Sequence, residues 1–393
     1  MNFKKQILFL AATCSAIAVS AQTPTTFTNK KDGNYKFTVV KNLDATAVQD
    51  QAHSGTCWTF SSLSFIESEL LRMGKPKVNL SEMFIVHTAY NMKADKYVRM
   101  HGTVNFGEGG AFHDVMKVVK DSGLVPQSVY SGFMNGEKDI NGEKHINHTE
   151  LDALTKSMVE TVIKSEHPGI AWKKAFNGTL DAYLGAVPKN FTYEGKQYTP
   201  ASFRDMLGIK AENYIEISSF KHHPFYSKFM LEVPDNWAAD EVYNLPLDEM
   251  IEAIDYAIMN GYTVAWGADV SEKGFSFKNG VAIVPNIEWS EVKKEKMDSV
   301  ILNPGPQMTI TQDMRQEAFD NYETQDDHGM HIVGIVKDQN GVKYYIVKKS
   351  WGTKGNDCDG YFYASEAFVR YKTTDLMFNK EGLKKEIAKK LGL

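Results

Sequence analysis

The sequence predicts an α+β protein, because helical patterns fill its first half and short strands dominate its last third. Of its 393 residues, 42% are hydrophobic, which is enough for a large core without disulfide bonds. This length allows one large domain or two lobes. We therefore expect a helical part and a strand-rich part that meet at a cleft.

The first residues have the features of a signal peptide. Lysines at positions 4 and 5 precede an apolar run over residues 7–19, and residues 19–21 fit a cleavage site that requires small side chains. The run is too short for a membrane-spanning helix, and no later segment is apolar enough to be one. We therefore expect residues 1–21 to be removed and residues 22–393 to act in the periplasm or outside the cell, without membrane contact.

Cysteine content and charge narrow the possible roles of the mature chain. Loss of the signal peptide removes Cys14 and leaves Cys57 and Cys358. Because export permits disulfides, these two either form one long-range bridge or include a thiol with a chemical role. The net charge is −5, with Lys and Glu interspersed and no basic stripe. This pattern gives no indication of a nucleic-acid partner.

Cys57 lies at the predicted start of a helix. An apolar stripe at helical spacing follows it, formed by Phe60, Leu63, Ile66, Leu70 and Met73. Gly74 is suited to the C-terminal cap and Pro76 prevents continuation. A thiol in the first turn is close to unpaired backbone N–H groups and to the positive end of the helix dipole. We therefore expect the pKa of Cys57 to be lower than that of a free cysteine.

The residues before Cys57 favour a nucleophile over a structural cysteine. A single cysteine ahead of an apolar helix is more often a small buried side chain. Here, however, Gly55 permits close approach of a ligand to the backbone. Gln51 can also direct an N–H group at an oxyanion beside the Cys57 amide. We interpret Cys57 as a thiolate nucleophile.

The remaining elements follow from periodicity and end signals. Ser81 is a good N-cap for a helix that runs to about residue 98. Residues 149–246 differ in character and are interpreted as an insertion, largely helical. We expect further helices at 111–121, 151–163, 170–184, 247–259 and 382–393, a hairpin at 191–198, and strands at 37–40, 262–266, 281–284, 331–336, 344–347 and 360–363.

His328 is the best candidate for the base that a thiol nucleophile needs. It precedes an apolar strand, which would hold it rigidly, whereas His222 and His223 resemble solvated loop residues. Downstream, a second strand ends in a Trp-Gly turn where Trp351 can cover the imidazole from water and strengthen its pairing with the thiolate. His328 and His331 can alternatively be half of a metal site, but two histidines without further ligands are a weak signal.

Five separated motifs together resemble papain-like cysteine peptidases. They are Gln51-x-x-Ser54-Gly55-Thr56-Cys57-Trp58, Leu80-Ser81-Glu82, Gly109-Gly110, His328-Gly329-Met330 and Lys349-Ser350-Trp351-Gly352, with Gly334 following His328. The spacing of about 270 residues between Cys57 and His328 exceeds the roughly 130–150 of small papain-like enzymes. Together with Ser54 in place of a cysteine of the papain branch, this spacing indicates the bleomycin hydrolase/aminopeptidase C branch. The resemblance covers about residues 35–375.

The resemblance implies a papain-like two-lobed fold. We expect a helical lobe at about 50–135, the insertion at about 149–246, a β-rich lobe at about 247–375 and a C-terminal tail at 376–393. In the related branch an extended C-terminal arm enters the cleft and restricts cleavage to free amino termini. Here the tail has the pattern of a basic helix and not of an extended arm. We therefore expect an aminopeptidase, with an endopeptidase as the alternative. A homo-oligomer is a further possibility.

The resemblance also implies residue roles, with peptides as substrates and neither cofactor nor metal. Cys57 would attack the peptide carbonyl, His328 would act as acid and base, and Gln51 with the Cys57 N–H would form the oxyanion hole. Gly109 and Gly110 match the segment that pairs with the substrate backbone. Trp351 matches the tryptophan that shields the histidine.

One position departs from the family pattern. Lys349 stands where the family has an asparagine that orients the histidine. A lysine ammonium has no acceptor and repels an imidazolium, so we expect it to lower the pKa of His328. Lys349 can extend out to solvent, be deprotonated, or mark a peptide-binding pseudoenzyme. We expect a secreted cysteine peptidase that retains activity, with the pseudoenzyme as the alternative.

Overall fold

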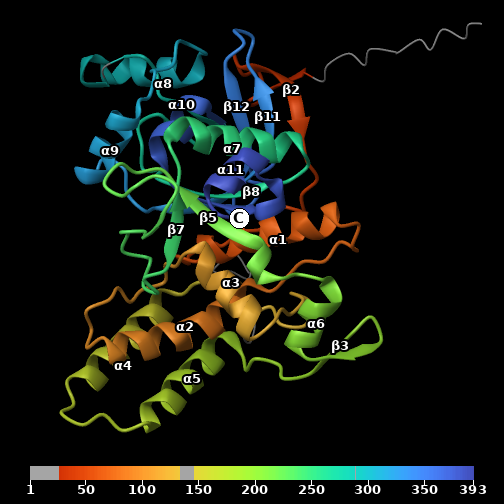
Figure 1. Cartoon of the computed structure of the whole chain (residues 1–393), viewed down its shortest axis with the longest axis vertical. Coiled ribbons are helices and arrows are strands. Elements are labelled where there is room, and N and C mark those ends of the chain that lie inside the picture. Colours follow the sequence, from red (N-terminus) through yellow and green to blue (C-terminus); the bar gives the residue numbers. More distant parts are fainter. Residues whose placement is uncertain (1–25, 133–145, 288) are drawn as a thin grey trace, which may run out of the picture.

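The computed structural model describes residues 26–132, 146–287 and 289–393. Figure 1 shows two lobes, with a group of helices at one end and a large sheet with its own helices at the other. Each lobe has a separate hydrophobic core: one gathers apolar residues mainly from positions 58–209 and the other mainly from 217–391. This arrangement confirms the predicted α+β class and the two lobes.

The helical lobe forms from segments whose ends are marked in the sequence. The Ser81 hydroxyl accepts a hydrogen bond from the Phe84 N–H at 3.0 Å, and Gly74 adopts φ +69° just after the first helix. The helices of this lobe are α1 (Cys57–Arg72), α2 (Glu82–Arg99), α3 (Phe112–Asp121), α4 (Thr149–Ile163), α5 (Ala171–Leu184) and α6 (Pro200–Leu207), and a small hairpin joins β3 (Phe191–Tyr193) to β4 (Lys196–Tyr198).

Twelve strands of the described chain form the main sheet, which is mostly antiparallel. They are β1 (Thr26–Thr28), β2 (Lys36–Asn42), β5 (Tyr214–Ser218), β6 (Lys228–Met230), β7 (Glu241–Asn244), β8 (Val264–Ala268), β9 (Phe275–Ser276), β10 (Val281–Ala282), β11 (His328–Lys337), β12 (Lys343–Lys348), β13 (Tyr361–Ser365) and β14 (Thr373–Asn379). Their order is β6-β7-β5-β14-β8-β11-β12-β13-β10-β9, and β2 joins β1 to β11. Strand β11 is therefore central.

Two helices enclose the centre of this sheet. Ala265 of β8 packs into the core of the helical lobe beneath α1, whereas its neighbour Trp266 packs into the second core with α7 (Leu247–Met259). Adjacent strand residues face opposite sides of a sheet, so α1 and α7 cover opposite faces. The other helices of this lobe are α8 (Lys294–Leu302), α9 (Gln312–Asp320), α10 (Glu366–Lys372) and α11 (Lys385–Lys390).

Two predicted boundaries were wrong. The insertion at 149–246 is helical only in its first part, because β5, β6 and β7 extend the main sheet. Likewise, the tail predicted at 376–393 begins inside β14, whose seven residues are all buried between β5 and β8. Short strands whose partners are distant in sequence leave no clear local pattern, so their pairing decides the structure.

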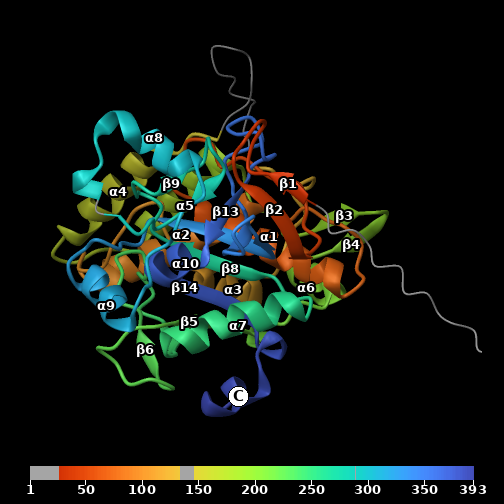
Figure 2. The same cartoon turned by 90° about the horizontal axis from the view of Figure 1, so that it is seen from above.

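The C-terminal residues pack against α7. Lys384 pairs with Glu252 at 2.6 Å and Lys390 with Glu249 at 2.7 Å, while Ile387 and Leu391 are buried in the second core. Figure 2 shows the C-terminal end beyond α7, on the side away from α1. The predicted basic helix is thus confirmed as α11. In the described ranges, no helix is both long and apolar enough to cross a bilayer. The predicted signal peptide at 1–21 lies outside the described residues.

Candidate active site

Cys57 is the first residue of α1 and lies where α1 meets β11. Gly329, the second residue of β11, makes this approach possible: a Cβ atom there would lie 2.6 Å from Ser61 Oγ and 3.3 Å from the Cys57 carbonyl oxygen. The Gly329 N–H is directed at the Cys57 sulfur. The close packing of strand and helix therefore places the head of β11, where His328 precedes Gly329, beside the first turn of α1.

The loop before Cys57 holds Gln51 in one orientation. Its Oε1 accepts a hydrogen bond from the Ser350 hydroxyl at 2.6 Å, and its Nε2 donates to the Ser54 carbonyl at 2.7 Å. The Gln51 N–H donates to the Ser350 carbonyl at 2.9 Å, which ties this loop to the turn that carries Trp351. A primary amide has two N–H groups. The second one can serve an oxyanion beside the Cys57 N–H, which lies in the first turn of α1.

The expectation of a low pKa for Cys57 was wrong. Burial raises the pKa of the Cys57 thiol to about 11, the Gly329 N–H and Lys349 oppose this effect, and Asp326 and Asp235 add to it. The positive end of the helix dipole is a modest influence, whereas removal of a thiolate from water is strongly unfavourable. In the free protein Cys57 is a neutral thiol at neutral pH.

His328 is a buried, neutral base. Burial lowers the pKa of His328 well below its usual value, and Lys349 lowers it further, as expected from the sequence. Its ring meets that of Trp351 at a centroid distance of 5.1 Å and an angle of 61°, so Trp351 covers the imidazole. Among the described residues, His328 Nε2 has no hydrogen-bond partner. The candidate nucleophile and the candidate base are therefore both disfavoured as charged groups.

Lys349 does not extend to solvent. Its side chain is only 2% exposed, so one of the three possibilities raised by the sequence is wrong. Its Nζ lies 3.4 Å from the ring centroid of Trp351 and 4.7 Å from that of Phe275, and it has no hydrogen-bond partner in the described ranges. Burial lowers the pKa of Lys349 well below its usual value, while Cys57 and Asp327 oppose the shift. Aromatic faces thus surround an amine that is neither solvated nor paired.

The two predicted substrate-binding glycines lie beside α1. The indole N–H of Trp58 donates to the Glu108 carbonyl at 3.0 Å. A Cβ at Gly110 would lie 2.9 Å from the Trp58 ring, and a Cβ at Gly109 would lie 1.9 Å from a carboxylate oxygen of Asp235. Protein side chains, rather than open space, therefore exclude larger residues at both positions.

Both remaining cysteines are free thiols. The Cys358 thiol is directed at the Asn29 carbonyl, and burial raises its pKa to about 12. The structure therefore contains no Cys57–Cys358 bridge, the alternative that the sequence had left open.

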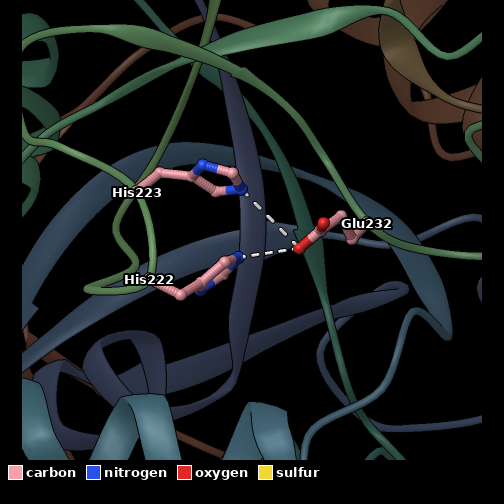
Figure 3. Close-up of side chains that lie close together, drawn as sticks. All are labelled: His222, His223 and Glu232. Carbon is pink, nitrogen blue, oxygen red and sulfur yellow. Dashed lines mark ion pairs between the residues drawn. The ribbon is translucent and has the colours of Figure 1, made fainter.

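A histidine cluster outside this site resembles a metal site only in outline. Figure 3 shows the Nε2 atoms of His222 and His223 directed at one Glu232 oxygen, at 2.9 and 3.7 Å. A histidine that binds metal through Nε2 carries its proton on Nδ1. Here the Gln316 amide nitrogen lies 2.9 Å from His222 Nδ1, and the amide oxygen already accepts the Lys221 N–H, so His222 Nδ1 is an acceptor. His222 therefore donates from Nε2 to Glu232.

The alternative metal site at His328 and His331 finds no support. Residues three apart on a strand face opposite sides, and His331 instead lies 2.9 Å from the Ser64 hydroxyl through Nδ1. The sequence interpretation missed Asp235 and Asp326, which influence the nucleophile. Asp326 was visible two residues before His328, whereas no local pattern marked Asp235.

Fold and site geometry agree with the comparisons to known proteins. The family model described as Peptidase C1-like family matches residues 1–392, so the chain belongs to this family of papain-like cysteine peptidases. Among curated relatives, Aminopeptidase G of Lactobacillus delbrueckii subsp. lactis is 21% identical, over 98% of this chain and 91% of the relative. Aminopeptidase C of Listeria monocytogenes is 24% identical, over 86% and 81%.

A solved structure has the same fold. The crystal structure of PepW from Lactobacillus rhamnosis HN001 superimposes with a TM-score of 0.67 at 20% identity, covering 90% of this chain and 84% of that protein. At this level of identity the match establishes the fold, which is the papain-like architecture predicted from the five motifs.

Proposed function

We propose that this protein is a cysteine aminopeptidase that hydrolyses peptide bonds through an acyl-enzyme on Cys57, with His328 as acid and base. The observation that carries this proposal is the contact between the first turn of α1 and the head of β11. Cys57 is the first residue of α1 and His328 the first residue of β11, and the fixed Gln51 amide belongs to the loop that leads into α1. The relatives named aminopeptidases support the reaction class.

Because Cys57 and His328 are both neutral before the reaction, the first step includes a proton transfer from the thiol to the imidazole. As the Cys57 sulfur bonds to the peptide carbonyl carbon, its proton moves to His328, which acts as a general base. The carbonyl oxygen becomes negative and is stabilised by the Gln51 amide and the Cys57 N–H. The C–N bond then breaks and the leaving amine takes the proton from His328. Water, deprotonated by His328, hydrolyses the thioester and restores the thiol.

A second candidate function is peptide binding without turnover. The buried Lys349, which lowers the pKa of His328 and lacks a hydrogen-bond partner among the described residues, favours it. A cation near His328 makes proton transfer from Cys57 less favourable. Loss of an orienting residue nevertheless reduces catalysis less than loss of the nucleophile. The persistence of Cys57, His328 and Gln51 therefore supports retained activity.

We also propose that the protein acts after export. The basis is the sequence of residues 1–21, in which two lysines precede an apolar run and small residues at 19–21. Amino-terminal sequencing of the protein secreted or transferred to the periplasm by its native host tests this proposal. A chain that begins at Gln22 agrees with it, and a retained amino terminus contradicts it.

A panel of fluorogenic aminoacyl amides tests the catalytic proposal. Wild-type protein should release the fluorophore, and Cys57→Ala should reduce the rate by about 10⁴-fold or more because no acyl-enzyme can form. Cys358→Ala is the matched control and should retain the rate. If the wild-type protein binds peptides but neither it nor the Cys358→Ala variant turns over any member of the panel, the pseudoenzyme is the correct function.

A further inference from the structure

The loop at residues 231–240, which connects β6 to β7, is held against the helical lobe. The Asn105 amide donates to Asp235 Oδ1 at 2.9 Å, and Lys96 Nζ donates to the Ala238 carbonyl at 3.3 Å. Within the loop, the Asn236 amide donates to the Leu231 and Asp240 carbonyls at 2.8 and 2.9 Å. The loop is thus held by side chains of the helical lobe and by its own turn.

Asp235 at the centre of this loop lies on the glycine segment beside Cys57. All three carboxyl atoms of Asp235 lie within 2.5 Å of the position that a Gly109 Cβ would occupy. The Asp235 N–H faces the carboxyl group of Asp326, which precedes His328 by two residues. The loop therefore reaches from the glycines of the helical lobe to the strand that carries the base, and it closes one side of the nucleophile.

Asp235 is the member of this acidic pair that ionises more readily. Burial raises the pKa of both carboxyl groups, but it raises that of Asp326 well above its usual value, and Asp235 adds to this shift. At Asp235, Lys93 and the Asn105 amide oppose the shift. In the described chain, Asp235 has no ion-pair partner within 4.0 Å. Its carboxyl group lies close enough to the nucleophile to raise the pKa of Cys57.

An aminopeptidase needs two features: an anion that receives the α-ammonium group of its substrate, and a wall that prevents longer chains from extending past it. We propose that Asp235 supplies the anion and that the residues next to it in the loop, 233–237, supply the wall, so that substrates are peptides with a free, cationic amino terminus. This inference rests on the proposed peptidase function. Cys57 and the unpartnered Nε2 of the buried His328 independently mark where the peptide binds.

The segment that contains α11 does not supply this anion. It is held on α7 by the Lys384–Glu252 and Lys390–Glu249 ion pairs, beyond α7 from α1 (Figure 2). Asp235, from a different part of the chain, lies beside the glycine segment instead.

The test compares two substrates that differ only at the amino terminus: an aminoacyl fluorogenic amide and its N-acetylated form. Asp235→Asn keeps the size of the side chain and an acceptor for Asn105, but it removes the charge. It should lower kcat/KM for the free amine by about tenfold or more, because a charged hydrogen bond is lost. Activity on the acetylated substrate should not fall. Asp240→Asn, an exposed change in the same loop, should leave both values unchanged.

The outcomes separate this inference from the peptidase proposal. If wild-type protein cleaves both substrates equally well, or if Asp235→Asn reduces both equally, Asp235 does not recognise the amino terminus and the inference is wrong, although the peptidase function stands. If no substrate is cleaved above the Cys57→Ala background, the peptidase function itself fails. Thermal unfolding of the Asp235→Asn and Asp240→Asn variants shows whether either change disturbs the fold.

Discussion

Two histidine–lysine combinations lie at the neighbouring strands β11 and β12 and differ in their hydrogen bonds: His331 with Lys348 within the strands, and His328 at the start of β11 with Lys349 directly after β12. His331 and Lys348 are register partners, both buried beneath α1. His331 Nδ1 lies 2.9 Å from the Ser64 hydroxyl, and Lys348 Nζ donates to the hydroxyls of Ser64 and Thr46 at 2.8 and 3.0 Å. This inner pair is held by hydrogen bonds to the helical lobe.

The outer pair, His328 and Lys349, lacks such bonds. In the described ranges His328 Nε2 and Lys349 Nζ have no partner, and both groups contact Trp351. His331 Nε2 is also without a partner, but the His331 ring is held through Nδ1. Buried polar groups are almost always hydrogen-bonded, so exceptions call for an explanation. Residue type and burial are the same in both pairs. The difference is therefore in the hydrogen bonds of the lysines and of the histidine Nδ1 atoms, and it agrees with a structural role for the inner pair and the proposed catalytic role for the outer pair.

Replacement of each histidine by alanine should have the largest effects, on catalysis for His328 and on stability for His331. His328→Ala should lower kcat/KM by about 10³-fold, because general acid–base catalysis is lost, while thermal stability is retained or improved. His331→Ala should retain most catalysis but lower the melting temperature, because the Ser64 contact and buried volume are lost. Fluorogenic kinetics and calorimetry on both variants measure this. Comparable activity losses in the two would contradict the assignment of the base.

The lysines should respond to the same substitution with opposite signs. Lys348→Met should lower the free energy of unfolding by about 2 kcal/mol, because the hydrogen bonds of Nζ to the Ser64 and Thr46 hydroxyls are lost. Lys349→Met should raise it by about 1 kcal/mol, since an unpaired buried amine is replaced by an apolar chain of similar length. Urea unfolding at neutral pH measures both. A loss of stability in Lys349→Met would show that its amine has a partner after all.

Local sequence patterns predicted well where Cys57, His328 and Trp351 lie in the fold. The start of α1 at Cys57 and the head of β11 at His328 follow from helical and strand periodicity, and the contact of Trp351 with His328 matches the expectation from the Trp-Gly turn. The fixed orientation of Gln51 agrees with its expected position. These features depend on neighbours within a few residues or on motifs that appear in a fixed order.

The electrostatic properties of the site depend on burial, which no short segment of the sequence specifies. The pKa of Cys57 was predicted in the wrong direction because the helix dipole is visible in the sequence and desolvation is not. For Lys349 the sequence left three explanations open, namely extension to solvent, deprotonation and a pseudoenzyme, and only its packing between Trp351 and Phe275 excludes the first. The strands β5, β6 and β7 were missed for a related reason: they are short, and they are stabilised by partners far away in sequence.

Replacement of Lys349 by asparagine, the family residue, tests the difference between the outer and inner pairs. It has the smallest expected effect of these substitutions. Lys349→Asn supplies an amide oxygen for His328 and removes the cation that lowers the pKa of His328, so kcat should rise several-fold. A general base acts when it is neutral, which is above its pKa. The acidic limb of the kcat/KM profile should therefore move from well below pH 6.5 in the wild type to a higher pH in the variant, closer to the ordinary histidine value of about 6.5.

Lys348→Met is the matched control for this profile, since Lys348 influences the pKa of His331 and not that of His328. It should leave the acidic limb where it is in the wild type, at temperatures where the variant stays folded. If Lys349→Asn moves neither the limb nor kcat, the cation does not act on the base, and the outer pair is no more functional than the inner one. If kcat falls while the limb moves as expected, Lys349 contributes to turnover through its own amine, which an asparagine cannot replace.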